Sequence, residues 1–427
     1  MSGRDDVVDR RSAEWFSPAF TVDPYPTYAD ARETPGLVRS VFGFWIATRA
    51  ADVEFVLSDR RFGKRNRETL TALRGSALLQ EPVFQMTGRM IINLDRPDHA
   101  RLRRLVNPAF VRPRMEALRP AVQRIVDGLI DKLYPQGRMD VIADFAYPIP
   151  VAVICDIVGI PDQARPVLRR LTDALVPSSE ARVLTTRELR EANEAAAEAA
   201  AFFRTLCAGR RDGEDTDLAG HLTACAHAGQ LSADELSANL MHLFMAGHET
   251  TVNFIGNAVL ALHKHPEVLA ALRADPAGIG QAVEELLRYD SSVQNIYRTA
   301  LCDVRIGDVL VREGDVVLCM LGAANRDPKV FADPDRLDIN RPHLKPYSFG
   351  GGMHYCLGAG LVRVEAEVAL ATLIQRIPGM ELRLEGRPDW KRNAQMRGLR
   401  SLPARWTVGS GQPVDVDTRD TRERSGA

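Results

Sequence analysis

Hydrophobic positions recur with helical spacing over most of the chain between residues 98 and 290. The segments RMEALRPAVQRIVDGLIDKL (114–133) and RELREANEAAAEAAAFFRTL (187–206) place apolar residues three and four positions apart, which predicts helices with one buried face. Alanine favours the helical backbone, so the second segment is interpreted as plain helix. A further helix is predicted for LGAGLVRVEAEVALATLIQRI (357–377), because Pro378 and Gly379 follow it as end signals.

Strand patterns occupy two shorter regions. LVRSVFGFWIA (37–47) and ALCDVRIGDVLVREGDVVLCML (300–321) are rich in β-branched and aromatic residues, and Gly-Asp pairs divide the second into short strands. The chain is therefore predicted to be mainly α with a minor β component. One folded domain is expected over residues 21–408, between loose tails at 1–20 and 409–427.

One predicted helix is long and apolar. Ser232 and Glu235 form a capping-box signature, and the pattern continues to Lys264, a length of about 48 Å. LMHLFMAGHETTVNFIGNAV (240–259) is apolar on almost every side, so the helix is expected to cross the centre of the protein. Buried polar groups cost free energy unless paired, and a glycine beside threonines can open the helical hydrogen bonds. The midpoint therefore predicts a buried reaction site in a broken helix, at Gly247, His248, Glu249, Thr250 and Thr251.

Composition narrows the class of protein. A net charge of −1 with 26% charged residues argues against a general nucleic-acid binder. No run reaches the roughly 20 apolar residues of a membrane span, and the polar N-terminus lacks a signal-peptide core, so a soluble, cytoplasmic protein is expected. The six cysteines contain no C-x-x-C pair, which argues against a disulfide framework and a zinc cluster.

Glycines surround one cysteine in SFGGGMHYCLGAG (348–360). Glycine is costly to order, so the run predicts a sharp bend or a close approach to a bound group. Cys356 precedes a predicted helix, whose free amides and dipole favour a thiolate. Backbone N–H groups turned toward a sulfur tune metal–thiolate centres. A single cysteine suits one axial bond to a large cofactor, whereas tetrahedral zinc needs three or four protein ligands.

Six motifs together resemble those of the cytochrome P450 family. FGGGMHYCLG (349–358) is similar to its haem-binding loop, F-G-x-G-x-H-x-C-x-G, and the others follow the family's order over nearly the whole chain. The resemblance implies a single triangular domain with a long central helix and small β-sheets, of the soluble bacterial type. The other motifs are HARLR (99–103), AGHETT (246–251), EELLR (284–288), YRTA (297–300) and NRDPKVFADPDRLDINR (325–341).

The resemblance assigns roles around the cysteine. Cys356 is implied to be the axial thiolate on the iron of haem b, where it favours O–O cleavage, and Phe349 is implied to shield its sulfur. The loop glycines of the implied cofactor site are Gly350, Gly352 and Gly358. The cations implied to bind the two haem propionates are His99, Arg103, Arg298 and His354.

A charged group is implied to support the cysteine loop. Glu285 and Arg288 are three residues apart, so they share one helix face. In the family they pair with an arginine from a later segment. Arg341 is assigned this role here, with Arg336 as the alternative.

The AGHETT segment is implied to lie on the oxygen side of the haem. Gly247, next to Ala246, would let dioxygen approach the helix, while Thr250 would hydrogen-bond it. Glu249 would help to deliver protons, and His248, at the variable position of the motif, is interpreted as structural. The acid–alcohol pair implies a monooxygenase, which inserts one oxygen atom and reduces the other to water.

Electrons are expected from separate proteins. The chain has neither a G-x-G-x-x-G dinucleotide site nor a cysteine set for an iron–sulfur cluster. The family implies a ferredoxin with its ferredoxin reductase, and a monomeric enzyme is expected. An acidic ferredoxin would dock by charge complementarity on a group of basic residues, which could equally form a solvated surface. The group consists of Arg101, Arg104, Arg112, Arg114 and Arg363.

The substrate is expected to be hydrophobic. In the family it contacts segments that correspond here to residues 64–93 and 170–190, the central helix and two later loops. LLQEPVFQMTGRMII (78–92) is apolar with few charges, which favours a hydrophobic ligand. A secondary metabolite such as a polyketide or macrolide is implied, with hydroxylation and epoxidation both open. Candidate contacts are Gln85, Val293, Gln294, Asn295, Ile296, Gln395 and Met396.

Two other functions compete with this interpretation. A haem-binding sensor or carrier would use the same cysteine loop without turnover. A hydrolase with a cysteine nucleophile would need His354 as a base beside Cys356, together with an oxyanion hole, and no other segment of the sequence supports it.

Overall fold

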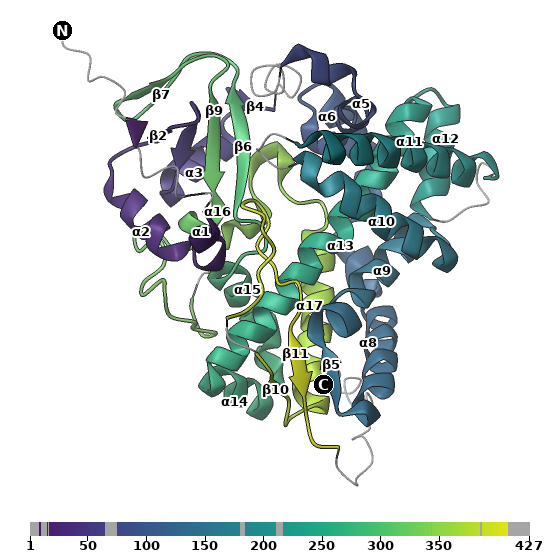
Figure 1. The fold of residues 1–427 in the computed structure, drawn as a ribbon, viewed down its shortest axis with the longest axis vertical. Helices are drawn as coiled ribbons and strands as arrows, with labels where there is room; N and C mark the ends of the chain where they lie inside the picture. The colour runs from purple at the N-terminus through teal and green to yellow at the C-terminus, as the bar shows by residue number, and fades with distance from the viewer. Residues whose placement is uncertain are drawn as a thin grey trace, which may run out of the picture.

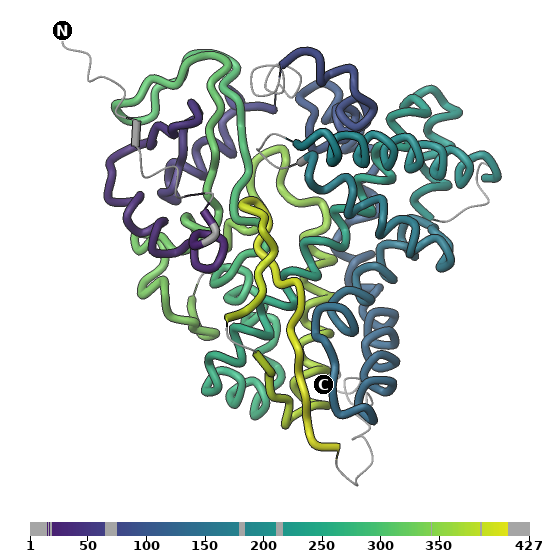
Figure 2. Tube along the Cα trace, in the orientation of Figure 1, coloured from purple at the N-terminus to yellow at the C-terminus, as the bar shows by residue number. Residues whose placement is uncertain are grey.

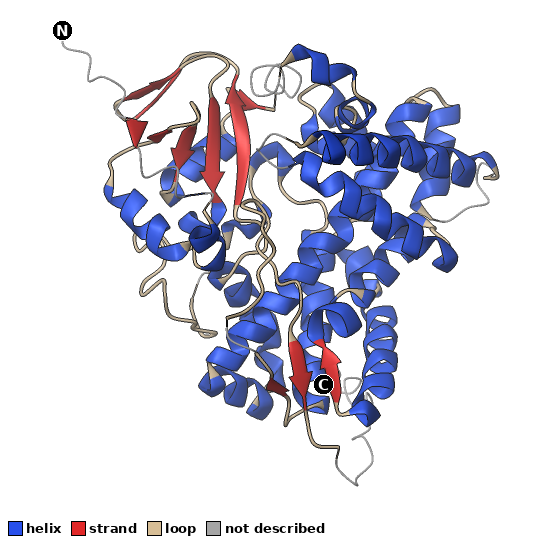
Figure 3. Ribbon diagram, viewed as in Figure 1, coloured by secondary structure: helices blue, strands red, loops and turns tan. Residues whose placement is uncertain are grey.

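Helices form most of the protein, and a six-stranded sheet lies to one side of them (Figures 1 and 3). The computed structural model describes residues 8–9, 15, 17–64, 75–179, 184–210, 217–342, 344–384 and 387–408. The prediction of a mainly α fold with minor β structure is confirmed. The α-helices are α1 (Pro18–Val22), α2 (Tyr25–Glu33), α3 (Ala50–Ser58), α5 (Pro82–Thr87), α6 (Asp98–Val106), α7 (Arg112–Ala117), α8 (Arg119–Leu133), α9 (Pro148–Val158), α10 (Arg165–Leu175), α11 (Thr186–Ala208), α12 (Leu218–His227), α13 (Ala233–Lys264), α14 (Pro266–Ala274), α15 (Ile279–Tyr289), α16 (Leu321–Ala324) and α17 (Ala359–Arg376).

Both regions predicted as strands contribute to the larger sheet, whose order is β1-β2-β3-β9-β6-β4. Strand β3 pairs in parallel with β9, and β6 pairs antiparallel with β9. A three-stranded sheet, β10-β11-β5, was not predicted, because its strands have only two or three residues each. The strands are β1 (Val8–Asp9), β2 (Val38–Ser40), β3 (Trp45–Ala47), β4 (Phe62–Gly63), β5 (Arg138–Asp140), β6 (Asn295–Ala300), β7 (Val304–Ile306), β8 (Val309–Val311), β9 (Val316–Met320), β10 (Glu381–Leu382) and β11 (Pro403–Arg405).

Packed structure begins closer to the N-terminus than the sequence predicts. Trp15 is 2% exposed and its ring lies 5.9 Å from that of Tyr28. Helix α1 begins after Ser17, whose hydroxyl accepts a hydrogen bond from the Phe20 amide. The expected tail at residues 1–20 is thus corrected, because aromatic side chains anchor part of it. The expected tail at 409–427 lies outside the described residues.

The long central helix is continuous. Helix α13 has the predicted bounds and the predicted capping box at Ser232 and Glu235, and it crosses the middle of the molecule (Figure 1). The predicted break at its midpoint is absent from the described backbone. Thr250 instead donates its hydroxyl to the Ala246 carbonyl, 3.3 Å away within the same helix, so its polarity is accommodated without opening the helical ladder.

One apolar stretch among the described residues, Val141–Val158, is long and apolar enough to resemble a membrane span by composition. Asp144 and Asp156 interrupt it, so it does not contradict the expectation that no uninterrupted apolar run reaches the length of a membrane span. The stretch comprises the π-helix Val141–Ala146 and helix α9, and 67% of it is buried inside the protein. Ile149 and Val153 belong to the same core as Ile255 of α13. Its position in the core accounts for its hydrophobicity.

Candidate active site

Two glycines of the cysteine loop have backbone angles that glycine adopts at low cost. Gly350 has φ +66° and Gly352 has φ +64°. A Cβ atom on Gly352 would lie 2.0 Å from the Leu57 carbonyl oxygen of α3. The Cys356 amide donates to the Phe349 carbonyl over 3.0 Å. Glycine thus lets the loop bend tightly against α3 and place Cys356 just before α17.

The Cys356 sulfur lies among groups that favour its thiolate form. Burial raises the pKa of the thiol, while the amides of Gly358 and Ala359 act against that rise. The charges of Arg103 and Arg363 act in the same direction as the amides. Because Ala359 is the first residue of α17, the amides belong to a helix N-terminus. A metal ion binds a thiolate and releases its proton, so the setting suits one metal–sulfur bond.

A buried charged group lies beneath the segment that leads into this loop. Glu285 and Arg288 are fully buried on α15, with 2.7 Å between their closest N and O atoms. Arg341 Nε lies 3.2 Å from Glu285 Oε2, whereas Arg336 offers its backbone carbonyl to Arg288 at 3.0 Å. Of the two arginines considered from the sequence, Arg341 therefore supplies the charged side chain.

Hydrogen bonds connect this group to the cysteine loop. Arg288 donates to the Asn325 carbonyl over 2.9 Å. The Asn325 side chain donates to the Ser348 hydroxyl over 3.0 Å and accepts from the Tyr347 amide over 2.7 Å. Buried ion pairs often contribute little net stability, so we attribute to this group the positioning of residues 347–349.

The histidines and arginines predicted to bind propionates gather beside the loop. The rings of His99 and His354 lie 4.4 Å apart, and Arg298 is 2% exposed. Arg103 donates to the Tyr355 carbonyl over 3.0 Å. Burial lowers the pKa of His354 to about 2, and the charges of Arg298 and other nearby cations add to that effect.

Lys64 joins this cluster and was missed by the sequence reasoning. It follows β4, is 5% exposed, and places its Nζ 4.0 Å from the centroid of the Tyr297 ring. Burial lowers its pKa, and the charge of Arg298 lowers it further. The signal in the sequence was a basic residue directly after a short strand, but many surface lysines share that pattern.

The cluster fits the two carboxylates of a haem. Arg298 Nη2 and His354 Nε2 are buried and have no hydrogen-bond partner in the described part of the chain. The buried Arg298 guanidinium needs an anion nearby, and a propionate would supply it and could also accept a hydrogen bond from the neutral His354. Apart from Gly358 itself, its chain neighbours and the nearby helix backbone, no heavy atom of the described residues lies within 4 Å of the position that a Cβ atom on Gly358 would take, so the loop leaves room there. The cluster would hold the haem at its propionates, and Cys356 would hold it at its iron.

Five side chains on one face of α13 keep accessible surface within the buried middle of the helix. Between Leu236 and Leu262 every other residue is buried except Gly247, which has no side chain and keeps partial exposure. Their spacing of three and four residues places them on a single face, and we call this set the distal stripe. It consists of His242, Met245, Ala246, Glu249 and Thr250.

Gly247 does not belong to that face. A Cβ atom on Gly247 would lie 2.6 Å from Cγ1 of Ile154 on α9. Its small size is required where α13 and α9 pack, which gives a second reason for glycine here. Its partial exposure leaves the role toward dioxygen as a prediction. His248 is buried, and its Nδ1 lies 2.7 Å from the Phe244 carbonyl oxygen, as a structural residue would.

Glu249 is paired with a residue from the end of the described chain. Lys391 Nζ lies 2.7 Å from Glu249 Oε1, because the segment after residue 387 runs beside α13 (Figure 2). Burial raises the pKa of Glu249, but the charge and hydrogen bond of Lys391 outweigh it and the pKa is lowered. Sequence reasoning missed Lys391, which lies 142 positions away from Glu249.

Three of the amides predicted to contact substrate are bonded within the protein. Tyr28 donates to Gln294 Oε1 over 2.9 Å, and Asn295 donates to the Ala394 carbonyl over 2.8 Å. Gln85 donates to the Leu79 carbonyl over 2.5 Å. Their side chains serve the fold, so we leave all three out of the candidate substrate site.

The remaining predicted contacts keep partial exposure. Val293 and Met396 form an isolated β-bridge, and the Gln395 carbonyl accepts from the amide of the residue after Val293. Ile296 places its Cδ1 3.1 Å from the position that a Cβ atom on Gly350 would take. Two segments that are distant in sequence, 293–296 and 395–396, therefore meet, and Ile296 lies beside the cysteine loop.

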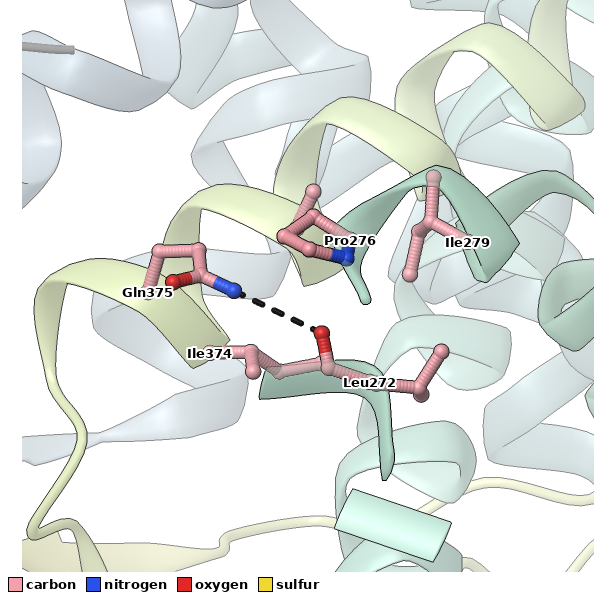
Figure 4. A pocket seen from close by; sticks show the side chains of 6 residues that line it. Leu272, Pro276, Ile279, Ile374 and Gln375 are labelled. Carbon is pink, nitrogen blue, oxygen red and sulfur yellow. Dashed lines mark hydrogen bonds between the residues drawn. The ribbon is translucent and has the colours of Figure 1, made fainter. Parts of the chain in front are cut away.

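A separate pocket contains none of these residues. It lies between α14, α15 and α17 (Figure 4). Its one polar side chain, Gln375, donates to the Leu272 carbonyl over 3.4 Å. No titratable group lines it, so we assign it no chemistry. The lining residues are Leu272, Pro276, Ile279, Ala371, Ile374 and Gln375.

Comparison with known proteins agrees with this geometry. The family model for cytochrome P450 matches residues 179–277 and 279–399. The chain is 39% identical to cytochrome P450 monooxygenase PikC of Streptomyces venezuelae, over 91% of this chain and 92% of that protein. It is 35% identical to 6-deoxyerythronolide B hydroxylase of Saccharopolyspora erythraea, over 91% and 97%. The crystal structure of CalO2 matches with a TM-score of 0.87 at 32% identity, covering 94% of this chain and 100% of that one.

The fold and the cysteine site define a haem–thiolate oxygenase. The chain belongs to the cytochrome P450 family and is a P450 monooxygenase. Members of the family carry haem iron, take oxygen from O2 and receive electrons from redox partners.

Proposed function

We propose that this P450 uses haem b to insert one atom of O2 into a hydrophobic secondary metabolite of polyketide or macrolide type. The relative named for hydroxylating 6-deoxyerythronolide B supports this substrate class. Phe84, Met90 and Ile91, from the apolar segment 78–92, share one core with Leu243 and Phe244 of α13, which suits a hydrophobic ligand. The product is an alcohol or an epoxide.

We propose that a ferredoxin and its reductase supply the electrons. The enzyme itself is proposed to be a soluble cytoplasmic monomer. Haem iron, when bound, supplies the redox chemistry that activates dioxygen. In the balanced reaction, a substrate C–H bond, O2, two protons and two electrons give a C–OH group and water. The protein must therefore deliver protons as well as hold the cofactor.

The chain's own residues divide this work. Cys356 binds the iron, and the cation cluster binds the propionates. Thr250 presents its hydroxyl from the distal stripe, where it now donates to the Ala246 carbonyl. Glu249 is ionised while Lys391 holds it, so it carries a proton toward Thr250 only when that contact opens. The buried cation cluster beside the cysteine loop is the observation that carries this proposal.

The hydrolase alternative loses support from the same observation. His354 lies against His99 and makes no hydrogen bond with Cys356, although both residues are described. Its pKa is lowered to about 2, so it is a weak base. A cysteine nucleophile would lack the activating partner that it needs.

One preparation tests the proposal. The reduced protein with CO should show the red-shifted Soret band of a haem–thiolate, Cys356→Ala should lose it, and Cys319→Ala, in a buried sheet position, should keep it. With ferredoxin, reductase and NAD(P)H, Thr250→Ala should consume electrons and release peroxide in place of product. The protein could show the CO band and yet convert none of a panel of macrolactones and steroids when electrons are supplied. That result would favour the sensor or carrier.

A further inference from the structure

The distal stripe carries one polar side chain that the proposed reaction does not use. His242 precedes Ala246 by four residues and Thr250 by eight, so all three lie on one face of α13. His248 is bonded to the Phe244 carbonyl. His242, in contrast, makes no hydrogen bond or ion pair with any residue that the structure describes.

His242 is enclosed by protein and yet accessible. It keeps partial exposure, while burial alone lowers the pKa of its imidazole to about 4. Asn239, Met241 and Leu243, which surround it on α13, are buried, so its accessible area lies within the buried middle of the helix, on the distal stripe. With this pKa the imidazole is neutral at physiological pH, and it offers one N–H donor and one nitrogen acceptor.

Its neighbours place it beside the segment predicted to contact substrate. Asn239, one turn earlier on α13, donates to the Arg89 carbonyl over 3.0 Å and accepts from the Ile91 amide over 2.8 Å. These bonds fix part of segment 78–92 over the helix. Met245, one turn after His242, is the apolar neighbour on the stripe. His242 thus lies between the fixed segment and Ala246.

We infer that His242 selects the substrate by hydrogen-bonding a neutral oxygen group, a ketone, ester carbonyl or hydroxyl, on an otherwise apolar molecule. The inference rests on the proposed function, because it places substrate against the distal stripe. A polar group in apolar surroundings is costly when it has no partner, and such a ligand would satisfy it. A carboxylate is disfavoured, because a neutral imidazole brings no charge to oppose it.

The helix also sets how far this oxygen lies from the site of oxidation. At 1.5 Å per residue, His242 is about 6 Å along α13 from Ala246 and about 12 Å from Thr250. The recognised oxygen and the oxidised carbon must therefore be several bonds apart. A macrolactone or steroid is long enough to satisfy both, whereas a small compact ring is too short.

Matched ligands test this inference with the full-length haem-loaded protein. We would compare cyclododecanone with cyclododecane, and a saturated steroid ketone with its parent hydrocarbon androstane, by the haem spin-state shift on titration. The wild-type protein should bind each ketone more tightly than its hydrocarbon. His242→Leu should reduce that preference about fivefold, the effect of one neutral hydrogen bond. His242→Gln should retain much of it.

Met245→Leu is the control, because it alters an apolar side chain on the same stripe and should leave the ketone preference unchanged. An unchanged preference in His242→Leu would overturn the inference, and so would an equal loss in Met245→Leu. The CO band of each variant reports that haem is bound. A wild-type protein without that band would refute the proposed function itself, which keeps the two failures distinct.

Discussion

A single lysine sets the protonation of Glu249. Lys391 lowers the pKa of this carboxyl against the upward effect of burial. A carboxyl whose pKa is lowered on folding stabilises the protein above its unfolded pKa, and this stabilisation is lost as pH falls through the folded value. In Lys391→Met, burial is opposed only by the weaker effects of His248 and of the Asn253 hydrogen bond, so the pKa of Glu249 should rise.

We therefore expect Lys391→Met to cost about 1–3 kcal/mol at neutral pH, because it leaves a buried charge without its partner. The deficit should shrink as the pH becomes mildly acidic and Glu249 takes up a proton. Denaturant unfolding of the wild type and the variant at both pH values measures the difference. The double variant Lys391→Met/Glu249→Gln should recover part of the loss at neutral pH, and a pH-independent deficit would contradict this account.

Single residues also show where sequence reasoning reaches its limit. Cys356 and Thr250 lie in local motifs, and motif spacing was enough to find them. Lys391 and Lys64 act through contacts between distant segments, and nothing in their own surroundings in the sequence marks them. For Gly247 the motif predicted a role toward dioxygen, and the structure adds its packing against Ile154, which the motif could not show because it does not say which neighbour a residue faces.

Among the elements, the crossing of α13 and α9 is governed by Gly247. Gly247→Ala would place a Cβ atom 2.6 Å from Cγ1 of Ile154, and overpacking of this kind costs about 1–3 kcal/mol. We expect a lower thermal unfolding midpoint for this variant, with the CO band and the yield of product per electron retained.

The matched variant Gly247→Ala/Ile154→Ala removes the atoms that clash. It should be less destabilised than the sum of the two single changes, since the residues are in contact. If Gly247→Ala left stability unchanged and instead released peroxide, the predicted role of this glycine in dioxygen access would be favoured over packing.

The elements differ in how well the sequence predicted them. Helix α13 was predicted with its cap and its end, because 32 residues give a strong periodic signal. Strands β5, β10 and β11 have two or three residues and were not predicted. Their existence depends on pairing between residues near 138, 381 and 404, which no local pattern encodes.

At the scale of the whole molecule, the basic residues proposed to bind an electron donor can be compared by exposure and pairing. Two of the five basic residues considered from the sequence are paired: Arg101 with Glu235 at 2.5 Å, and Arg363 with Glu284. Arg104 and Arg112 are exposed and form no ion pair with any described residue. Arg114 is exposed as well, as are the apolar Val111 and Tyr355. We call the exposed set, Arg104, Val111, Arg112, Arg114 and Tyr355, the proximal patch.

If an acidic ferredoxin docks on the proximal patch, Arg104→Gln/Arg112→Gln should weaken its binding about fivefold at low salt. The dependence of binding on ionic strength should also become less steep, because two charges are gone. Binding measured by calorimetry over a range of salt concentrations tests this. Arg312→Gln, on the far β7–β8 hairpin, is the control and should behave as wild type.

Arg397 joins the C-terminal segment 387–408 to helix α1 near the N-terminus. Its guanidinium bonds Asp290 and the carbonyls of Thr21 and Val22, and it stacks 3.6 Å from the centroid of Trp390. Lys391 lies on the same returning segment. A variant that begins after Val22 would lack two hydrogen-bond acceptors of Arg397. The segment that carries Lys391 would then be held less firmly against Glu249. Removal of the N-terminal residues should therefore alter proton delivery.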